Sequence, residues 1–224
     1  MATRRTTRTP ARATKPKKPA PVPAARPTPP PSPPPPSTGP SGARPKRFLS
    51  PEQLFAGVAE IVAIAAQERV PVVLVGGLAM QHYGSDRLTG DLDFAAADVL
   101  RSLPVIRPLT FGGVQTTTPG GVPVDLIVRD DDYQSLYEEI VSISPMVPEL
   151  GVRVVPPTHL AATKMAAGRD KDTLDLKFLL AEDGLVDLQR ARAVIRRHLG
   201  PYAAQEFDRV VDEVAWEKHR GRRE

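Results

Sequence analysis

The stretch that decides the fold spans residues 72–94 and reads VVLVGGLAMQHYGSDRLTGDLDF. A short β-branched run ends in the pair Gly76-Gly77, a compact helical pattern follows, and a second apolar run contains Asp91 and Asp93. Because residues i and i+2 of a strand point to the same face, these two carboxylates stand side by side near a glycine turn. Two negative charges at such a short separation are costly unless a cation lies between them. The pattern therefore indicates a divalent metal ion facing a bound phosphate.

A third carboxylate belongs to a later apolar run. Asp125 stands between Val124 and Leu126, and a charge there is costly unless it has a partner. If the strands align, Asp125 meets the first two carboxylates, and three such groups suit Mg²⁺ or Mn²⁺. Two such ions can clamp the attacking and leaving oxygens of a phosphoryl transfer. Glycines at a strand-to-helix turn would let backbone N–H groups approach the phosphate.

The order of these signals resembles the nucleotidyltransferases of the DNA polymerase beta superfamily. That pattern has a glycine pair or Gly-Ser after the first strand, an Asp-x-Asp/Glu strand and a later strand Asp. The spelling RLTGDLD at residues 87–93 is closest to AbiEii-type, abortive-infection or toxin-like members. A second block, KMAAGRDKDTLD at residues 164–175, resembles their lysine helix and the charged motif after it. The resemblance spans about residues 70–180.

The resemblance implies roles for the first block. Asp91 and Asp93 would hold the metal ion and the nucleoside triphosphate, and Asp125 would complete the site and help to deprotonate an acceptor hydroxyl. Gly76 and Gly77 would bind phosphate through backbone amides. Many superfamily members carry a serine at the second glycine position, whereas the Gly-Gly form occurs in the toxin-like relatives.

The second block and one further arginine complete the expected nucleotide site. Lys164 would neutralise the triphosphate, and Arg87 would contact phosphate or pair with a site carboxylate. Asp172 and Asp175 would lie on the following helix and orient Lys164 or Arg169. The alternative for the two aspartates and for Arg169 is an ordinary solvated helix or loop surface.

Other charged, histidine and aromatic residues have simpler interpretations. The run of acids at residues 130–132 is expected at a helix N-terminus, where Asp is favoured, rather than in a metal cluster. The four histidines are scattered without metal-ligand spacing and are expected to pack or face solvent. Phe207 and Trp216 recur at helical spacing and are expected in the core.

The order of strands and helices predicts an α+β fold, or an α/β-like one. Ser50-Pro51-Glu52-Gln53 predicts a helix start with a capping box. Strands are expected near residues 72–75, 92–95, 122–128 and 152–155, helices from residue 158 onward, and a weaker helix near residues 98–102. We expect a nucleotidyltransferase fold, a small mixed sheet flanked by helices. The catalytic core would be residues 48–156 and the helical part residues 157–224.

The first 47 residues differ in kind from the rest. They hold fifteen of the twenty-six prolines and eleven of the thirty Lys/Arg, and no Asp or Glu. The other nineteen bases face all twenty-six acids, so residues 48–224 carry a net charge of −7. The tail is therefore expected to be disordered, with an extended Pro-rich centre. A solvated leader, a nucleic-acid tether and an organelle transit peptide are the alternatives.

Composition narrows the classes of function. The chain has no cysteine, which excludes disulfides, thiol catalysis and cysteine-ligated zinc. It has no apolar run long enough to span a bilayer and no apolar leader core, so a cytoplasmic location and no membrane partner are expected.

These features predict a metal-dependent nucleotidyltransferase that moves a nucleoside monophosphate from an NTP to an acceptor hydroxyl and releases pyrophosphate. The toxin-like resemblance favours RNA, such as a tRNA end, as the acceptor, and a cognate antitoxin as a partner. A small-molecule or protein acceptor is one alternative. A non-catalytic binding module or regulatory partner with the same fold is the other.

Overall fold

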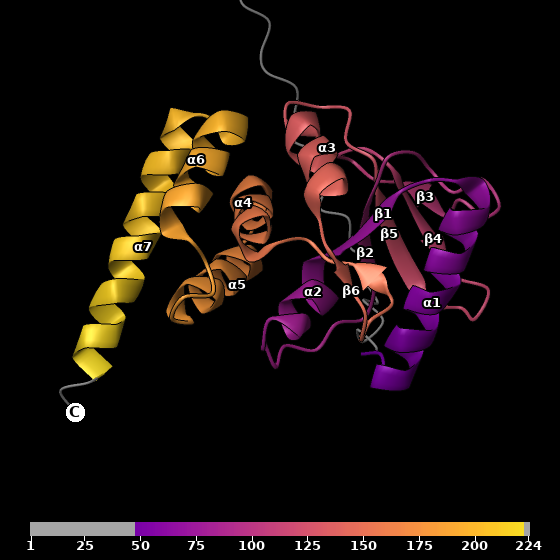
Figure 1. The fold of residues 1–224 in the computed structure, drawn as a ribbon, viewed down its shortest axis with the longest axis horizontal. Helices are drawn as coiled ribbons and strands as arrows, with labels where there is room; N and C mark the ends of the chain where they lie inside the picture. Colours follow the sequence, from indigo (N-terminus) through magenta and orange to yellow (C-terminus); the bar gives the residue numbers. More distant parts are fainter. Residues whose placement is uncertain (1–47, 222–224) are drawn as a thin grey trace, which may run out of the picture. The chain divides into compact units, whose positions relative to one another are not determined.

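A computed structural model describes residues 48–221 of the 224-residue chain. The expected tail, residues 1–47, lies outside the described residues. The elements, labelled in Figure 1, are α1 (Pro51–Glu68), β1 (Val72–Val75), α2 (Gly76–His82), β2 (Leu92–Ala96), β3 (Arg107–Pro108), β4 (Val114–Thr117), β5 (Pro123–Ile127), α3 (Gln134–Ile143), β6 (Met146–Val147), β7 (Val152–Arg153), α4 (Pro157–Ala167), α5 (Asp170–Ala181), α6 (Leu188–Leu199) and α7 (Pro201–Gly221). The α+β prediction is confirmed. The strands form a small mixed sheet, and helices precede and follow these strands along the chain.

Helix α1 begins at the predicted capping box. The Ser50 hydroxyl accepts a hydrogen bond from the backbone N–H of Gln53, and the Gln53 side chain accepts one from the N–H of Ser50. Both groups would otherwise be unsatisfied at a helix start. Leu54, Val58 and Ile61 then recur on one buried face. The helix therefore forms where its cap and its apolar stripe agree.

The main sheet has the strand order β1-β2-β5-β4-β3. Strands β2 and β5 are parallel, and the other neighbouring pairs are antiparallel. In the parallel pair Asp93 lies opposite Asp125, and in the antiparallel pair Val75 lies opposite Asp93. Because paired residues point to the same face, the end of β1 and both aspartates share one face of the sheet.

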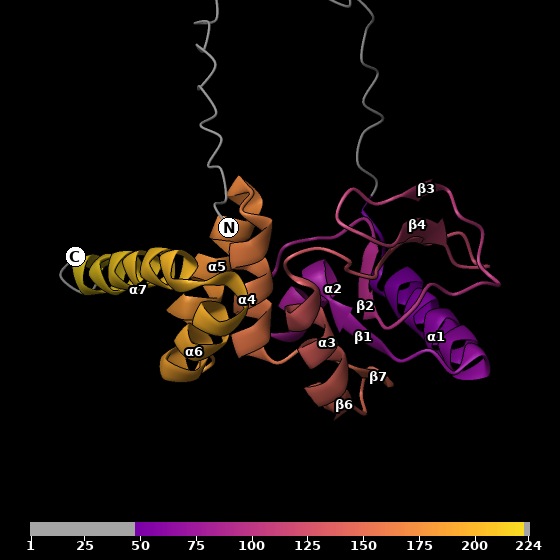
Figure 2. The ribbon, with the colours of Figure 1, turned by 90° about the horizontal axis from the view of Figure 1, so that it is seen from above.

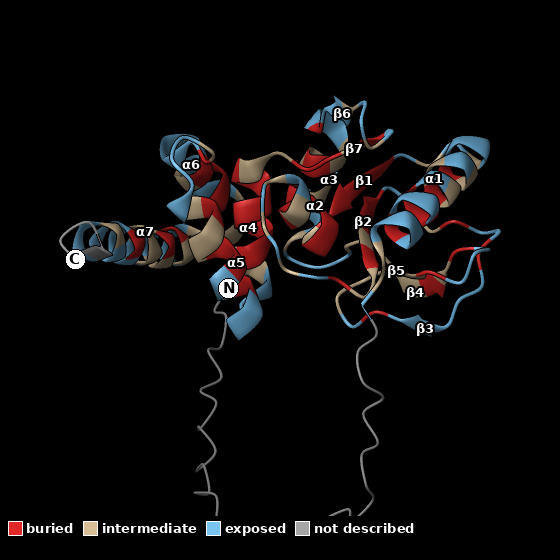
Figure 3. Cartoon of the chain, turned by 90° about the horizontal axis from the view of Figure 1, so that it is seen from below, coloured by how far each residue is buried: buried red, intermediate tan, exposed pale blue. Residues whose placement is uncertain are grey.

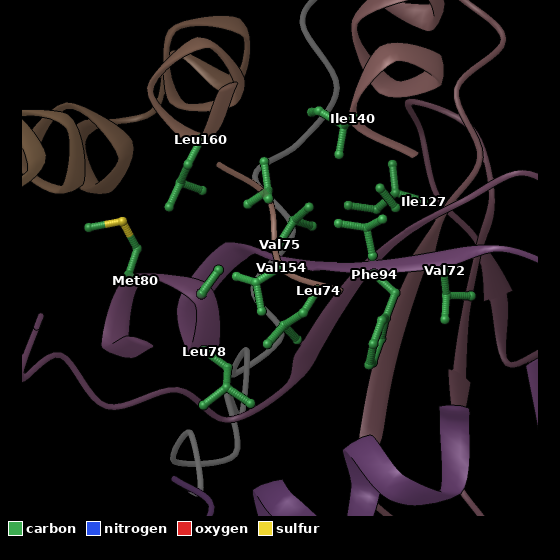
Figure 4. Packing of buried hydrophobic residues seen from close by; sticks show 14 of the residues in the cluster. Val72, Leu74, Val75, Leu78, Met80, Phe94, Ile127, Ile140, Val154 and Leu160 are labelled. Carbon is green, nitrogen blue, oxygen red and sulfur yellow. The ribbon is translucent and has the colours of Figure 1, made fainter. Parts of the chain in front are cut away.

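The two faces of the sheet are covered differently. Leu74 and Phe94, which are paired and fully buried, lie on one face, while Ile140 of α3 lies over the other (Figure 4). Strand β1 is buried along its whole length, as its β-branched sequence predicts. The face under α3 changes from apolar to acidic at Asp93 and Asp125. Asp93 and Asp125 line a cavity on this face.

Helices α4, α5, α6 and α7 pack on one another and lie to one side of the sheet in both Figure 1 and Figure 2. Figure 3 shows the buried residues concentrated in β1, β2 and α4, with exposed residues on β3. The change from strands to helices occurs between β7 and α4, near the expected boundary at residue 157. The division of one domain, residues 48–224, into a catalytic core at residues 48–156 and a helical part at residues 157–224 stays a prediction. No helix in residues 48–221 is long and apolar enough to cross a membrane.

Two local predictions are wrong and one agrees with the structure. The acids at residues 130–132 lie directly before α3, at its N-terminus, where Asp131 accepts hydrogen bonds from Arg129 and from the N–H of Tyr133. Residues 98–102 form a bend, irregular chain and a turn instead of a helix. Phe207 is fully buried, but Trp216 is 60% exposed and lies beside Arg220. Helical spacing alone could not separate these two aromatic residues, because α7 has only one packed side.

One carboxylate links α3 to the helical part. Glu139 of α3 accepts hydrogen bonds from His159 of α4 at 3.1 Å and from His198 of α6 at 2.6 Å, and Arg197 donates at 2.9 Å. Burial acts to raise the pKa of Glu139, but these partners together hold it below its ordinary value. Burial lowers the pKa of His159 despite the carboxylate. The expectation that the histidines pack is right for His159, which is fully buried.

His159 makes stability depend on pH in a defined window. Because its pKa in the folded chain lies below the ordinary 6.5, the unfolded chain takes up a proton first as the pH falls below 6.5. The contribution of His159 to the free energy of unfolding should therefore decrease from pH 7.5 toward pH 5.5. His159→Gln, whose amide can still donate to Glu139, should flatten this dependence in urea titrations. His82→Gln, at an exposed histidine, is the control, and an unchanged slope in His159→Gln would contradict the assignment.

Candidate functional site

One cavity of about 510 Å³ brings most of the predicted site together. Nine of the ten predicted residues line it: Gly76, Gly77, Arg87, Asp91, Asp93, Asp125, Lys164, Arg169 and Asp172. The tenth, Asp175, is buried and contacts two of the others. The volume falls in the range of small-ligand sites, about 300–1,000 Å³. Residues that are up to 96 positions apart in sequence therefore meet at one place.

The turn at the end of β1 is built around Asp93. Gly76 has φ +63°, and a Cβ there would lie 1.9 Å from the Asp93 carboxylate oxygen. A Cβ on Gly77 would lie 2.6 Å from the hydroxyl of Thr89. The backbone N–H of Gly77 donates to Asp93 at 3.2 Å. The amide that the resemblance assigned to phosphate thus binds a carboxylate in this structure. Asp93 fills the space of a side chain at Gly76, and Thr89 fills it at Gly77, so both positions require glycine.

Each of the other two carboxylates has its own donor. The Thr89 hydroxyl donates to Asp91 at 3.0 Å, and the Gln115 amide donates to Asp125 at 2.8 Å. We expected the three carboxylates to converge within reach of one metal ion. They share the cavity, but no group of three His, Cys, Asp or Glu side chains within residues 48–221 lies close enough to hold an ion. The separate donors turn the carboxylates toward different partners, which is why that geometry is not met.

The charges of the three carboxylates nevertheless act on one another. Burial and, to a smaller extent, the charges of Asp91 and Asp125 raise the pKa of Asp93 to about 6. The hydrogen bond from the Gly77 N–H and the charge of Lys164 act in the opposite direction. Burial also raises the pKa of Asp125, with Asp91 adding to it and Gln115 opposing it. Crowded, partly desolvated carboxylates of this kind are stabilised by a nearby cation. The donor set, all oxygen and strongly anionic, fits Mg²⁺ or Mn²⁺ in its chemistry.

A buried ionic network forms the opposite wall. The Lys164 ammonium lies 2.6 Å from Asp175 and 3.4 Å from Asp172, and all three side chains are less than a tenth exposed. Lys164 is on α4 and the two aspartates are on α5, so the network joins the helices across the α4–α5 turn at Gly168. Buried charges persist only when they are paired in this way.

Two arginines extend this network to the surface. Arg87 pairs with both carboxylate oxygens of Asp175, at 2.9 and 3.2 Å, and is 36% exposed. Arg169 pairs with Asp172 in the same two-pronged way and is 58% exposed. Burial acts to raise the pKa of Asp172, but Arg169 and Lys164 together hold this pKa below its ordinary value. Three cations thus share two carboxylates, leaving one unit of positive charge.

The sequence did not predict several residues of the cavity. Among its lining residues are Thr89, Arg107, Leu109, Phe111, Ile127, Arg129, Tyr137 and Lys171. Gln115, which donates to Asp125 and accepts from Arg107 at 2.9 Å, was missed as well. Only the period-two run from Asp125 through residues 127 and 129 gave a usable signal, because it puts three side chains on one face. Of the others, Thr89 precedes β2 and Lys171 is on α5, while the rest come from the β3–β4 hairpin and α3, whose positions the sequence pattern does not fix.

The cavity is less acidic than the chain around it. Six of its lining residues are Lys or Arg and four are Asp. Asp131 and Asp175, which pair with Arg129 and Arg87, bring the formal charges into balance, whereas residues 48–224 carry a net charge of −7. A phosphate group would therefore meet less repulsion here than on the surface in general.

Comparison with known proteins gives little further guidance. No family model and no curated protein matches the chain. The solved structure of the antibiotic-resistance factor ANT(2″)-Ia is 13% identical, with 70% of this chain and 97% of that one covered at a TM-score of 0.43. An antigenic nucleotidyltransferase-like protein from Paracoccidioides brasiliensis is 16% identical, with 74% and 95% covered and a TM-score of 0.43. At these scores neither likeness establishes a shared fold or activity.

The contact between Gly76 and Asp93 can be tested with a matched pair of substitutions. Gly76 and Gly151 both have φ +63°, but a Cβ on Gly151 would meet nothing within 4 Å. Gly151→Ala should cost only the left-handed backbone strain, about 1–2 kcal/mol. Gly76→Ala should lower the free energy of unfolding by a further ~1–3 kcal/mol, because the methyl group displaces Asp93. Equal losses in chemical denaturation would show that Asp93 does not determine the glycine.

The raised pKa of Asp93 predicts a second stability effect. Because the folded-state pKa of about 6 exceeds the ordinary 3.8, stability present at low pH is lost as the pH rises through 6. In EDTA, Asp93→Asn should therefore melt a few degrees above the wild type at pH 8, and the difference should shrink at pH 5. The amide oxygen can still accept from the Gly77 N–H. A variant that melts below the wild type at pH 8 would contradict this account.

Proposed function

We propose that this chain is a metal-dependent nucleotidyltransferase of the DNA polymerase beta superfamily. It would transfer a nucleoside monophosphate from an NTP to an acceptor hydroxyl and release pyrophosphate. The observation that carries the proposal is the pairing of Asp93 with Asp125 across parallel strands, inside a cavity closed by a fixed set of cations. Carboxylates facing cations across one cavity are suited to a metal-bound triphosphate.

The cationic wall would bind the triphosphate. Lys164 and Arg169 line the cavity and are held by Asp172, so they are positioned before the substrate arrives. Arg87 is held by Asp175 in the same way. Catalysis of phosphoryl transfer consists mainly of such positioning and charge neutralisation. Asp172 and Asp175 would therefore act through these cations rather than on the substrate.

Asp125 would be the base for the acceptor. A carboxylate oxygen of Asp125 would take the proton of the acceptor hydroxyl while the hydroxyl oxygen of the acceptor attacks the α-phosphorus. The bond between the α-phosphorus and the bridging oxygen then breaks, and pyrophosphate leaves with the electron pair. The raised pKa of Asp125 makes it a better proton acceptor than an ordinary aspartate, and the Gln115 amide keeps its second oxygen oriented.

To hold Mg²⁺ or Mn²⁺ together, Asp91, Asp93 and Asp125 would turn toward the ion from their present donors, Thr89, Gly77 and Gln115. When bound, the ion would neutralise the phosphate oxygens and the three carboxylates together. The cost of keeping Asp93 ionised in a partly desolvated place is the physical reason to expect an ion there.

RNA, such as a tRNA end, is the proposed acceptor, and an AbiEii-type toxin with a cognate antitoxin is the proposed biological setting. The support is the spelling of residues 87–93 and 164–175. The basic residues 1–47 would add affinity for RNA that does not depend on its sequence. We place this reaction in the cytoplasm, where NTPs and tRNA are both present.

Transfer can be measured by incubating the full chain with each α-labelled NTP, Mg²⁺ and total RNA. The wild type should label RNA with at least one NTP. Asp93→Asn should lower incorporation at least about a hundredfold, and Asp125→Asn should lower kcat by about 10²–10⁴ with little change in NTP affinity. Asp212→Asn, an exposed aspartate on α7, should behave as the wild type.

A melting experiment supplies a readout that does not depend on turnover. Mg²⁺ with NTP should raise the melting temperature of the wild type and have less effect on Asp93→Asn. If the label stays on small molecules or on the protein, the RNA acceptor is wrong and the transferase is kept. If no NTP gives Mg²⁺-dependent incorporation into any acceptor, a non-catalytic binding module replaces the transferase.

A further inference from the structure

The lining of the cavity contains two chemically different groups of side chains, called here its phosphate end and its aromatic end. The first comprises the glycine turn, the aspartates and the cations described above. The second comprises Leu109 and Phe111 from the β3–β4 hairpin, Ile127 from β5 and Tyr137 from α3. These four side chains have no role in the transfer step proposed above. An apolar and aromatic surface that continues from a phosphate-binding surface needs a separate explanation.

Arg129 forms the centre of this aromatic end. Its guanidinium carbon lies 5.2 Å from the ring centre of Phe111, 5.1 Å from that of Tyr133 and 5.3 Å from that of Tyr137. Asp131 pairs with it through both carboxylate oxygens, and only 10% of the Arg129 side chain is exposed. The guanidinium is therefore fixed in orientation and its charge is balanced. A fixed planar cation among aromatic rings makes a rigid stacking surface.

Tyr137 adds a hydrogen-bond donor to this surface. Burial raises the pKa of its phenol to about 12, so the hydroxyl keeps its proton at neutral pH. Within residues 48–221 no group forms a hydrogen bond with this hydroxyl. The charges of Asp93 and Arg169 both act on it, so the ring lies within electrostatic range of the phosphate end. A phenol in this position can donate to a ligand that spans both ends.

We propose that Phe111, Ile127 and Tyr137, with Arg129 behind them, form a subsite for a nucleobase. The inference rests on the proposed function, because it takes the other end of the cavity as the phosphate site. Bases stack on aromatic rings and on arginine planes, and their edges accept hydrogen bonds from groups such as a phenol. The base has two sources, the NTP itself or the terminal nucleotide of an RNA acceptor, and the chemistry of the subsite is the same for both.

The sequence offers a closely matched control. Tyr133 and Tyr137 both contact Arg129, yet only Tyr137 lines the cavity. Tyr137→Leu and Tyr133→Leu each remove one ring from the guanidinium, so a general loosening of Arg129 affects both. Tyr137→Phe removes only the hydroxyl. Melting temperatures of all three variants identify any that do not fold, and Tyr137→Phe keeps the test valid if Tyr137→Leu is among them.

The measurement has two arms on the full chain. The first titrates each labelled NTP with Mg²⁺ and without acceptor, and the second determines the KM for RNA. Tyr137→Leu should weaken binding about tenfold or more, and Tyr137→Phe about three- to fivefold, while Tyr133→Leu stays within twofold of the wild type. Weaker NTP binding identifies the NTP as the source of the base. An unchanged NTP affinity with a raised KM for RNA identifies the acceptor as its source.

The proposal is overturned if neither arm changes in a folded Tyr137 variant, or if Tyr133→Leu has the same effect as Tyr137→Leu. Failure of the transferase proposal gives a different pattern. In that case no variant and no wild-type chain incorporates label, yet the NTP titration can still show the difference between the two tyrosines. The same titration on Asp93→Asn separates the contribution of the base from that of the triphosphate, since that variant retains the aromatic end.

Discussion

The structure depends on the contact between the Asp93 carboxylate and the turn that ends β1. This carboxylate occupies the volume that a side chain on Gly76 would fill, and it accepts the N–H of Gly77. A carboxylate so close to a backbone is tolerated only if the turn has no Cβ and the strand register is fixed. The strand register fixes the position of Asp93, because Asp93 lies opposite Val75 of β1 on one side and Asp125 of β5 on the other. Fold and acidic site are thus parts of one constraint.

The placement of charge follows from that constraint. Burial, with added repulsion from Asp91 and Asp125, raises the pKa of Asp93 to about 6 on one side of the cavity. The other side of the cavity carries Lys164, whose buried ammonium pairs with both Asp172 and Asp175. That ammonium is paired with both carboxylates, and the pairing fixes its direction. The cavity therefore holds positive charge in a chain segment that is acidic as a whole, without depending on the basic residues at the start of the sequence.

The sequence predicted most of what depends on local pattern. Strand β1, the capped start of α1 and the end of α4 at Gly168 follow from residue types within a few positions of one another. The aspartates were found because period-two spacing decides which face a side chain takes. The Gln115 donor to Asp125 and the ring of Tyr137 were missed, because they depend on how the hairpin and α3 lie against the sheet. The bond from the Gly77 N–H to Asp93 was missed because it depends on the register between β1 and β2. The prediction that Trp216 is buried was wrong for a related reason. Helical spacing shows which face of the helix a residue lies on, but not whether another element packs against that face.

Helix α3 connects these parts of the molecule. Leu136 and Ile140, four residues apart, are fully buried and fix the helix against the sheet. Tyr137 and Glu139 are two residues apart and so point to different sides of the helix, one to the cavity and one to α4 and α6. The position of the aromatic ring is therefore set by two anchors, an apolar one under the helix and a polar one beside it. A change at Glu139, outside the cavity, would reach the nucleobase subsite through the tilt of this one helix.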